Sequence, residues 1–234
     1  ILDFININFL ILFYFLYTIR LFPHKYFGKL LYYNFIRLGP VGIKIGQILS
    51  HRIDFLSYEV CDILSELTNN VPCADTKEEI DNDIKYLKKF QSWEKIGSGC
   101  VATTYLIHTS SNTFVIKIKK KNIHDKIISS IERLHNIISL FKYFSISARD
   151  ILNKLGNIFD ILIKQSDFNS ELQELEYFHE KFNGVRRIRV PKPYVEYCNE
   201  NIIVMEYLKG IELKELDKTN REVLAKELWN FAFE

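Results

Sequence analysis

Two features with the chemistry of phosphate binding lie near the middle of the sequence. Small residues form the run Ile96-Gly97-Ser98-Gly99-Cys100, and a loop without bulky side chains lets backbone N–H groups approach phosphate oxygens. Lys117 follows in the apolar run Phe114-Val115-Ile116-Lys117, where a buried ammonium group needs an anionic partner. Both features have simpler interpretations, because a hairpin turn also uses small residues and an edge-strand lysine can point to water.

The order of this loop and lysine is the order found in protein kinases, where a strand lysine contacts the nucleotide phosphates and pairs with a helix glutamate. No lysine directly follows the glycines, so a P-loop of the G-x-x-x-x-G-K type is excluded. The candidates for the glutamate are Glu171, Glu174 and Glu176. Glu171 and Glu174 share a helix face, but a glutamate-rich helix is also typical of a solvated surface, so spacing alone does not choose among them.

The elements that position these residues are predicted to be hairpins and separate helices. One hairpin joins the strand-like runs 101–107 and 113–119, and a second joins 194–197 to 202–207 through a turn at 199–201. Helical patterns cover residues 25–50 (interrupted near Gly39-Pro40), 57–68, 76–90, 127–141, 151–162 and 167–182. Strands grouped in hairpins, with helices set apart, predict an α+β fold with an antiparallel sheet rather than a doubly wound parallel sheet.

Composition and charge narrow the class of protein. Of the 234 residues 47% are hydrophobic and 26% are charged, which excludes a largely disordered chain. The net charge of +2 gives no electrostatic footprint for nucleic acid, and we interpret the basic run at Lys119 to Lys121 as a solvated strand end. The four cysteines form no C-x-x-C pair, so we expect neither a metal site nor disulfides but reduced thiols in an intracellular protein; they are Cys61, Cys73, Cys100 and Cys198.

The segment before residue 25 raises the question of a membrane. Phe9 to Tyr17 is continuously apolar or aromatic, but a spanning helix needs about 20 apolar residues. No basic region precedes this run, so we do not expect a secretory signal peptide. The run predicts a helix that packs on the domain or lies on a membrane surface through residues 9–22, and a membrane anchor is the alternative.

A further motif lies in the first helical region. Lys44-Ile45-Gly46-Gln47 matches the K-x-G-Q motif of the UbiB/AarF-domain atypical kinases, and the flanking runs Arg37-Leu38-Gly39-Pro40 and Ser50-His51-Arg52-Ile53-Asp54 also resemble that family. The likeness continues through Val204-Met205-Glu206-Tyr207-Leu208-Lys209-Gly210, which resembles the family's fifth strand and hinge. The resemblance covers residues 30 to 234, and it implies a kinase-like N-lobe preceded by a helical extension.

The resemblance also implies roles for individual residues. Lys117 would hold the nucleotide phosphates of ATP, and Glu171 would pair with it. The loop over the nucleotide would be Ile96, Gly97, Ser98, Gly99, Cys100, Val101 and Ala102. Met205 would line the adenine pocket, and the backbone near Glu206 and Tyr207 would bind the adenine edge. Lys44 and Gln47 would lie on an extension that folds over the site and restricts access by protein substrates.

Three departures from the family pattern bear on function. The family loop is rich in alanine, whereas Gly97-Ser98-Gly99 is closer to an ordinary kinase loop. Gln165 stands where the family has an acid, two residues before Asp167, so the regulatory set of Lys44, Gln47, Gln165 and Asp167 would lack one charge. The sequence contains no H-x-D-x-x-x-x-N stretch and no D-F-G, which supply the catalytic aspartate and the magnesium ligands in kinases.

The sequence therefore predicts the ATP-binding portion of an atypical kinase or ATPase, without the magnesium ligands and inactive alone. Both ends lie inside patterns that would continue, so we expect a piece of a longer protein. The expected divisions are an apolar segment (1–24), a helical extension (25–90), a nucleotide-binding lobe (91–207), and a hinge with the start of a C-lobe (208–234). The resemblance suggests a link to lipids or isoprenoid quinones. The alternative function is a truncated, non-catalytic pseudokinase that binds a nucleotide, lipid or protein.

Overall fold

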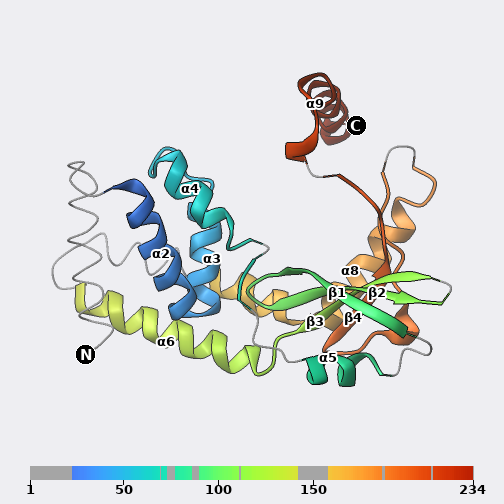
Figure 1. The fold of residues 1–234 in the computed structure, drawn as a ribbon, viewed down its shortest axis with the longest axis horizontal. Coiled ribbons are helices and arrows are strands. Elements are labelled where there is room, and N and C mark those ends of the chain that lie inside the picture. The colour runs from blue at the N-terminus through green and yellow to red at the C-terminus, as the bar shows by residue number, and fades with distance from the viewer. Residues whose placement is uncertain are drawn as a thin grey trace.

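The computed structural model of the chain describes residues 23–68, 70–72, 77–85, 90–110, 112–141, 158–185, 188–211 and 213–233. Its named helices are α2 (His24–Leu38), α3 (Pro40–Leu49), α4 (Tyr58–Ser65), α5 (Lys77–Ile84), α6 (Ile123–Phe141), α8 (Phe168–Lys181) and α9 (Lys218–Phe233), with 3-10 turns η1 (Val195–Tyr197) and η2 (Leu213–Glu215). The strands are β1 (Phe90–Ser98), β2 (Ala102–Thr109), β3 (Thr113–Lys119) and β4 (Ile202–Glu206). A further helical stretch covers residues 158–166. Figure 1 shows α2, α3, α4 and α6 at one end of the molecule and the sheet with α5 and α8 at the other.

The first helices form where the sequence predicts them. The break near Gly39-Pro40 is confirmed, because Gly39 has a φ of 90° and Pro40 begins α3, a position at which its missing N–H group costs nothing. The next helix, α4, buries Val60 and Leu64, which are four residues apart and therefore lie on one face. These helices contact one another, and α3 also contacts α6.

The sheet is antiparallel with the strand order β1-β2-β3-β4, as the α+β prediction requires. Its two faces differ, because successive side chains of a strand point to opposite sides. Ile116 and Ile118 pack in one hydrophobic cluster with Ile80 and Ile84 of α5. Lys117 alternates with these isoleucines, so it lies on the opposite face of a strand that has neighbours on both sides.

Two strand predictions need correction. The hairpin of β2 and β3 is confirmed, but the second hairpin is wrong: Val195–Tyr197 forms η1, and β4 pairs with β3 instead. The segment does begin beside β4, since the Tyr194 N–H donates to the Val204 carbonyl at 2.9 Å and Pro193 forms an isolated bridge with Met205, but the chain then turns into η1 at Val195. The strand β1 was not predicted. Two irregularities in its pairing with β2 interrupt the alternation that would have identified it.

A second hydrophobic cluster joins the helices at one end of the molecule to the edge of the sheet. It contains Val41 and Leu64 from α3 and α4, Val101 from the loop after β1, Ile127 from α6, and Phe168 from α8. Apolar burial is the main favourable contribution to packing, so this cluster fixes the helices to the loop and to α8. A shared core thus holds the helices of residues 23–68 against the sheet.

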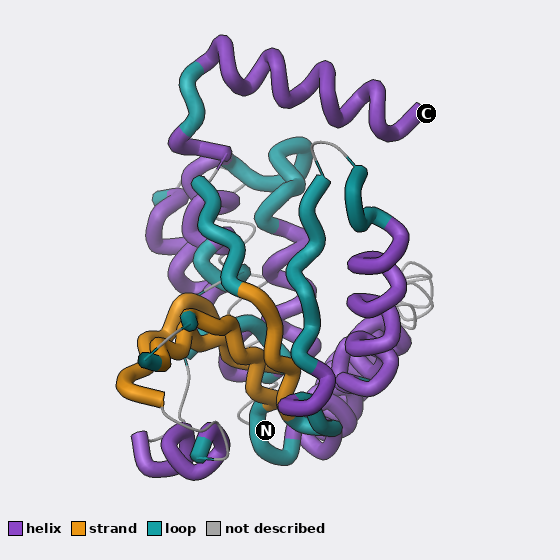
Figure 2. The backbone as a smooth tube through the Cα atoms, turned by 90° about the vertical axis from the view of Figure 1, so that its right-hand side faces the viewer, coloured by secondary structure: helices purple, strands orange, loops and turns teal. Residues whose placement is uncertain are grey.

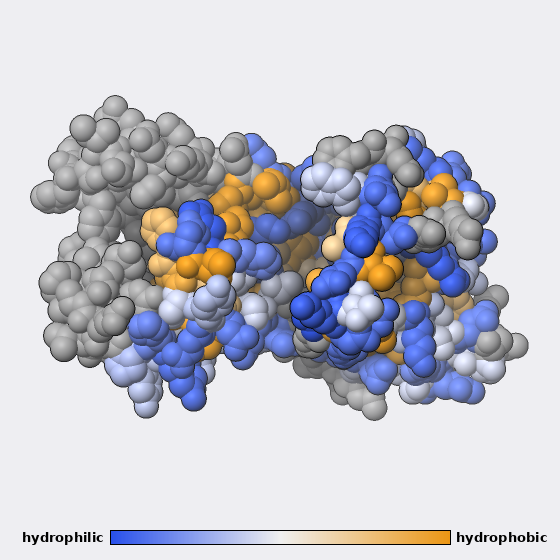
Figure 3. Space-filling model, turned by 90° about the horizontal axis from the view of Figure 1, so that it is seen from above, coloured by the Kyte–Doolittle hydropathy of each residue, from blue (hydrophilic) through white to orange (hydrophobic). Residues whose placement is uncertain are grey.

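The last described helix, α9, lies apart from the other elements. Figures 1 and 2 both show α9 standing apart from the sheet, and among the described residues neither hydrophobic cluster includes a residue of α9. Val223 and Trp229 of this helix are 53% and 67% exposed. Figure 3 shows hydrophobic side chains reaching the upper surface in separate patches among hydrophilic ones.

The predicted membrane segment, residues 9–22, lies outside the described residues. Among the helices that the structure does describe, none combines the length and the apolar character needed to cross a membrane. Three of the four cysteines are described, and Cys61, Cys100 and Cys198 are free thiols.

Candidate functional site

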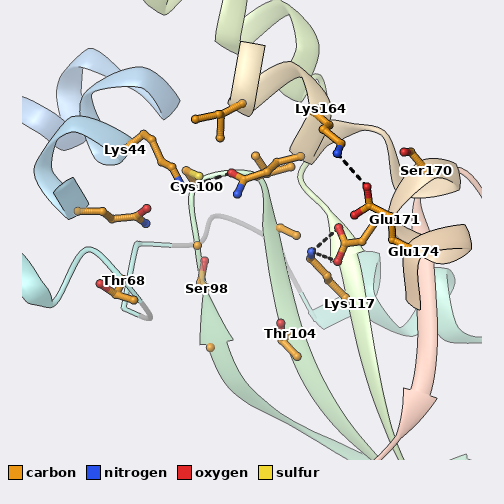
Figure 4. A pocket seen from close by; sticks show the side chains of 17 residues that line it. Lys44, Thr68, Ser98, Cys100, Thr104, Lys117, Lys164, Ser170, Glu171 and Glu174 are labelled. Carbon is orange, nitrogen blue, oxygen red and sulfur yellow. Dashed lines mark hydrogen bonds and ion pairs between the residues drawn. The ribbon is translucent and has the colours of Figure 1, made fainter. Parts of the chain in front are cut away.

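A pocket of about 600 Å³ lies where the extension helices, the loop after β1 and the helix α8 meet. Figure 4 shows side chains from all of these elements pointing into it. Its lining comprises Lys44, Gln47, Thr68, Gly97, Ser98, Gly99, Cys100, Val101, Ala102, Thr104, Lys117, Ile161, Lys164, Gln165, Ser170, Glu171 and Glu174. Residues that are far apart in the sequence, including most of those predicted to act together, therefore share one cavity.

The lysine of β3 and a glutamate of α8 form an ion pair in this pocket. The Lys117 Nζ atom lies 2.5 Å from Oε1 and 2.7 Å from Oε2 of Glu171. Their side chains are 27% and 34% exposed, so the pair is partly screened by solvent. The lysine is on an interior strand and has an anionic partner, which excludes the edge-strand interpretation. Of the three candidate glutamates, Glu171 is therefore the one that pairs with Lys117.

The start of α8 aligns this glutamate. Asp167 is the N-cap of α8, and its Oδ1 atom accepts hydrogen bonds from the N–H groups of Asn169 and Ser170 at 3.1 and 3.2 Å. Phe168 is buried at the first helical position, and the Nζ atoms of Lys117 and Lys119 lie 5.0 and 4.8 Å from the centre of its ring. Contacts of this length are cation–π interactions, which hold α8 against β3.

The loop after β1 is a tight, buried turn. Gly97 and Ser98 belong to β1, and the Gly99 N–H donates to the Ala102 carbonyl at 2.9 Å. The tip of the turn is packed against the extension, since Cys100, Val101 and Ala102 are 7%, 5% and 6% exposed. Burial raises the pKa of the Cys100 thiol above its ordinary value. The predicted small-residue turn is therefore displaced, because Ile96, Gly97 and Ser98 belong to β1 and the turn begins at Gly99, with its tip in the core.

Hydrogen bonds from residues outside the turn hold it in place, and one of them joins the Lys120 N–H to the Val101 carbonyl at 2.9 Å. The Val71 N–H donates to the Ser98 carbonyl at 3.0 Å, and Lys120 Nζ donates to the Gly99 carbonyl at 2.6 Å. Our interpretation of Lys119 to Lys121 as a solvated strand end is therefore wrong for two of the three. Lys119 contacts the Phe168 ring and Lys120 fixes the loop, while Lys121 is exposed.

Two residues of the K-x-G-Q motif line the pocket from α3. The Lys44 Nζ atom lies 3.5 Å from the Gln165 Oε1 atom, across 121 positions of the chain. Gln47 Nε2 donates to the Leu67 carbonyl at 2.9 Å, which attaches α3 to the end of α4. Gly46 faces Leu67 and Phe35, where an added Cβ atom would lie 2.3 Å from Leu67 Cδ1. The motif thus combines two polar groups in the pocket with a glycine that permits close packing.

Several residues of the pocket were not among the predicted site residues. Lys164 is one of them, and it forms an ion pair at 2.8 Å with Glu174, a glutamate that was considered as the partner of Lys117. Thr104 is another, and it lies opposite Lys117 on the neighbouring strand. The hairpin turn at 109–112 was a usable signal for Thr104, because residues equally far from a hairpin turn face each other. Thr68, Ile161 and Ser170 come from loops and helices whose packing the sequence does not specify.

Some predicted site residues are not brought to this pocket. Ile96 is 49% exposed, and Asp167 is occupied as a helix cap. Met205, Glu206 and Tyr207 also do not line it. The Glu206 carboxylate binds the Arg189 guanidinium and accepts from the Lys192 N–H at 3.3 Å. Their assignment to an adenine site stays a prediction, and it concerns a region beside the pocket rather than the pocket itself.

The acidic groups of the described residues do not gather into a metal site. No group of three histidine, cysteine, aspartate or glutamate side chains in the described ranges could hold a metal ion. Glu171 and Glu174, the two carboxylates of the pocket, are each paired with a lysine.

Comparison with known proteins identifies a matching family and several relatives. A model of the ABC1 atypical kinase-like domain matches residues 67–234. The chain is 26% identical over 222 residues to Protein ACTIVITY OF BC1 COMPLEX KINASE 8, chloroplastic, of Arabidopsis thaliana, covering 90% of this chain and 29% of that protein. It is 26% identical over 213 residues to a Probable protein kinase UbiB of Glaesserella parasuis, covering 84% of this chain and 39% of that protein.

A protein of Clostridium pasteurianum described as an uncharacterized protein in the hydrogenase 1 5' region is 30% identical over 201 residues. The match covers 80% of this chain and 37% of that protein. The chain thus spans between 29% and 39% of the length of these three relatives.

Proposed function

Because the chain belongs to the ABC1 atypical kinase-like family, we propose that it binds ATP in the pocket between α3, the loop after β1 and α8. The observation that carries this proposal is the Lys117–Glu171 ion pair, with Nζ–Oε distances of 2.5 and 2.7 Å, inside a cavity bounded by a glycine-containing turn. This is the arrangement by which kinases hold a strand lysine ready for nucleotide phosphates.

The size and charge of the pocket suit a nucleoside triphosphate. Pockets for small ligands measure about 300–1,000 Å³, and this cavity is within that range. Lys44, Lys117 and Lys164 bring positive charge to its wall. In our proposal Lys117 binds phosphate oxygens and Glu171 keeps its ammonium group in position. The adenine ring would extend toward Met205, as the family resemblance implies. Magnesium would arrive bound to the phosphates, and we name no protein ligand for it in this chain.

The reaction that the whole protein would carry out is phosphoryl transfer or ATP hydrolysis, for which bound ATP supplies the reactive phosphoryl group. Groups that activate an acceptor and bind magnesium would come from a catalytic loop and a D-F-G segment, which these 234 residues do not contain. The contribution of this chain is therefore to bind and orient the nucleotide. A lipid or isoprenoid-quinone partner, and a membrane surface met through residues 9–22, remain parts of the proposal that rest on resemblance and on the apolar sequence.

A second function is a non-catalytic binding module, and the lining of the pocket favours it, because the described lining residues include no carboxylate beyond Glu171 and Glu174 and no histidine. Glu171 and Glu174 are each engaged by a lysine, so neither is free to act as a general base. Such a module would bind ATP without turnover, and nucleotide binding would change how its helical extension meets a partner.

Thermal unfolding in the presence of ATP and magnesium tests the main proposal. We expect ATP to raise the melting temperature of the chain, because a ligand that binds only the folded state stabilises it. Lys117→Ala should abolish the rise, whereas Lys29→Ala, which removes an exposed charge from α2, should retain it. If ATP leaves the melting temperature of the unaltered chain unchanged, the proposed site does not bind ATP.

Release of phosphate from ATP separates the two functions. A chain that binds ATP but releases no phosphate above the buffer rate supports the non-catalytic module for this part of the protein. Phosphate release that disappears with Lys117→Ala would show that these residues suffice for hydrolysis and would contradict the module.

A further inference from the structure

Among the described residues that line the pocket, positive and negative charges are unequal in number. Three lysines line it (Lys44, Lys117 and Lys164) against two glutamates (Glu171 and Glu174), which leaves one positive charge in excess. Two of the lysines are neutralised locally, since Lys117 pairs with Glu171 and Lys164 pairs with Glu174 at 2.8 Å. The excess charge therefore belongs to the third lysine.

Among the described residues, the hydrogen-bond partner of Lys44 is a neutral amide. Its Nζ atom lies 3.5 Å from the amide oxygen of Gln165, and within the described part of the chain no carboxylate forms an ion pair with it. Figure 4 shows Lys44 reaching toward the pocket from α3, on the side opposite Lys117 and Glu171. An amide carbonyl stabilises an ammonium group less than a carboxylate does, because it contributes a dipole rather than a full charge.

We propose that Lys44 binds the phosphate oxygens of the nucleotide from the extension side, and that Gln165 is the residue that keeps it available for this role. The inference rests on the proposed function, since it concerns the same pocket. A lysine paired with a carboxylate shares its positive charge between that partner and a phosphate, whereas Lys44 has one long hydrogen bond to a neutral amide and keeps its full charge for the ligand. A ligand held by Lys44 on one side and Lys117 on the other would bridge α3 to β3.

Gln165→Glu is the decisive substitution, because it places a carboxylate where the amide oxygen now lies near Lys44. We expect the new ion pair to weaken the binding of ATP and of inorganic tripolyphosphate by about tenfold. Gln173→Glu is the matched control, since it adds the same charge to an exposed position on α8 outside the pocket, and it should bind both ligands as the unaltered chain does. Adenosine, which carries no phosphate, should bind equally to all three.

Substitution of Lys44 itself provides a second test. Lys44→Met should weaken the binding of ATP and tripolyphosphate by about tenfold or more, and Lys44→Arg, which keeps the charge, should retain most of the affinity. Hydrogen exchange provides a readout that does not depend on affinity. ATP should slow amide exchange in residues 40–49 of the unaltered chain, and Lys44→Met measured at saturating ATP should lose that protection.

The outcomes distinguish this inference from the proposed function. If Lys117→Ala abolishes ATP binding while Lys44→Met and Gln165→Glu bind ATP normally, the pocket is a nucleotide site and the role of Lys44 is wrong. If tripolyphosphate binds in a Lys44-dependent manner and ATP does not bind, the role of Lys44 stands and the nucleotide function fails. If the unaltered chain binds neither ligand, both are overturned.

Discussion

The Nζ atom of Lys117 lies within hydrogen-bonding distance of both carboxylate oxygens of Glu171, although 54 positions separate the two residues. The lysine is on an interior strand and the glutamate is in the first turn of α8. The ion pair would therefore break if α8 moved away from the sheet. The pair therefore reports directly on the docking of α8 against the sheet.

A double-mutant cycle on this pair should detect its contribution to stability. We expect a coupling free energy of about 1 kcal/mol between Lys117→Met and Glu171→Gln, lower at high salt, because the partly exposed charges are screened. Urea unfolding of the single and double variants measures it. Lys164 and Glu174 form the matched control: they are 68% and 53% exposed, and their coupling should be smaller than that of the first pair. Equal coupling in both cycles would contradict the docking role.

Replacement of Asp167 should test whether this carboxylate acts as a helix cap or as part of the site. Loss of an N-cap costs about 1 kcal/mol, so Asp167→Ala should lower the free energy of unfolding by that amount. Asp167→Ser also caps helices and should restore stability together with ATP binding. If Asp167→Ser is stable but binds ATP as weakly as Asp167→Ala, the charge of Asp167 is needed in the site itself.

A methyl group added at Gly42 on α3 should destabilise the fold. A Cβ atom at Gly42 would lie 2.4 Å from the backbone oxygen of Phe35, which cannot move without shifting α2. Gly42→Ala should therefore destabilise the chain by about 1–3 kcal/mol, although alanine normally favours a helix over glycine. Gly99→Ala is the control, because its added Cβ atom would lie 3.9 Å from the nearest neighbour, and its stability should change by less than about 0.5 kcal/mol.

The thiol of Cys100 should react slowly in the folded chain. Burial raises its pKa, so at pH 8 a smaller fraction is the reactive thiolate than in an exposed cysteine. We expect iodoacetamide to label Cys100 at least about tenfold more slowly in the native chain than in urea, as measured by mass spectrometry. The labelling rate should increase at a higher pH in the native chain than in the unfolded one. Rapid native labelling at pH 7 would show that the loop is open.

Because the pKa of Cys100 is raised in the folded chain, the free energy of unfolding depends on pH. The folded-state pKa is above the ordinary thiol value of 9.0, so the unfolded chain loses this proton first as pH rises. The contribution of this thiol is complete below pH 9 and is lost as pH rises through the folded-state pKa. Unfolding of Cys100→Ala and of the unaltered chain in urea between pH 8 and pH 10.5 should show a shallower decline for the variant.

Local sequence patterns were sufficient to predict the elements that carry the ion pair. The hairpin of β2 and β3 has a short polar turn between alternating apolar residues, and α8 begins at Asp167, so these elements are fixed by local interactions. The choice of Glu171 over Glu174 depends instead on how α8 is rotated against β3. That rotation is set by the burial of Phe168, a contact between segments far apart in the sequence.

Other features depend on packing that no local pattern encodes. β1 was missed because its pairing irregularities break the alternation, and η1 replaced a predicted strand because the chain turns at Val195 after only a short stretch beside β4. The pairing of Lys164 with Glu174 joins two helices whose relative position follows from the shared core. The K-x-G-Q motif marked α3 as important, but only the three-dimensional arrangement brings Lys44 to Gln165.

Cys100, Val101 and Ala102 are buried beneath the extension. This burial couples the opening of the loop to the movement of the extension, whereas an exposed phosphate loop could open by itself. Lifting this loop exposes apolar side chains of the core and breaks the bond between the Val71 N–H and the Ser98 carbonyl, so the loop cannot open while the extension stays packed. We therefore expect the loop and the extension to open together, and the rate of this opening would set the shortest residence time of a molecule enclosed under the loop. A mutation that loosens α3, far from the bound phosphates, would then shorten residence without changing a single contact to the ligand.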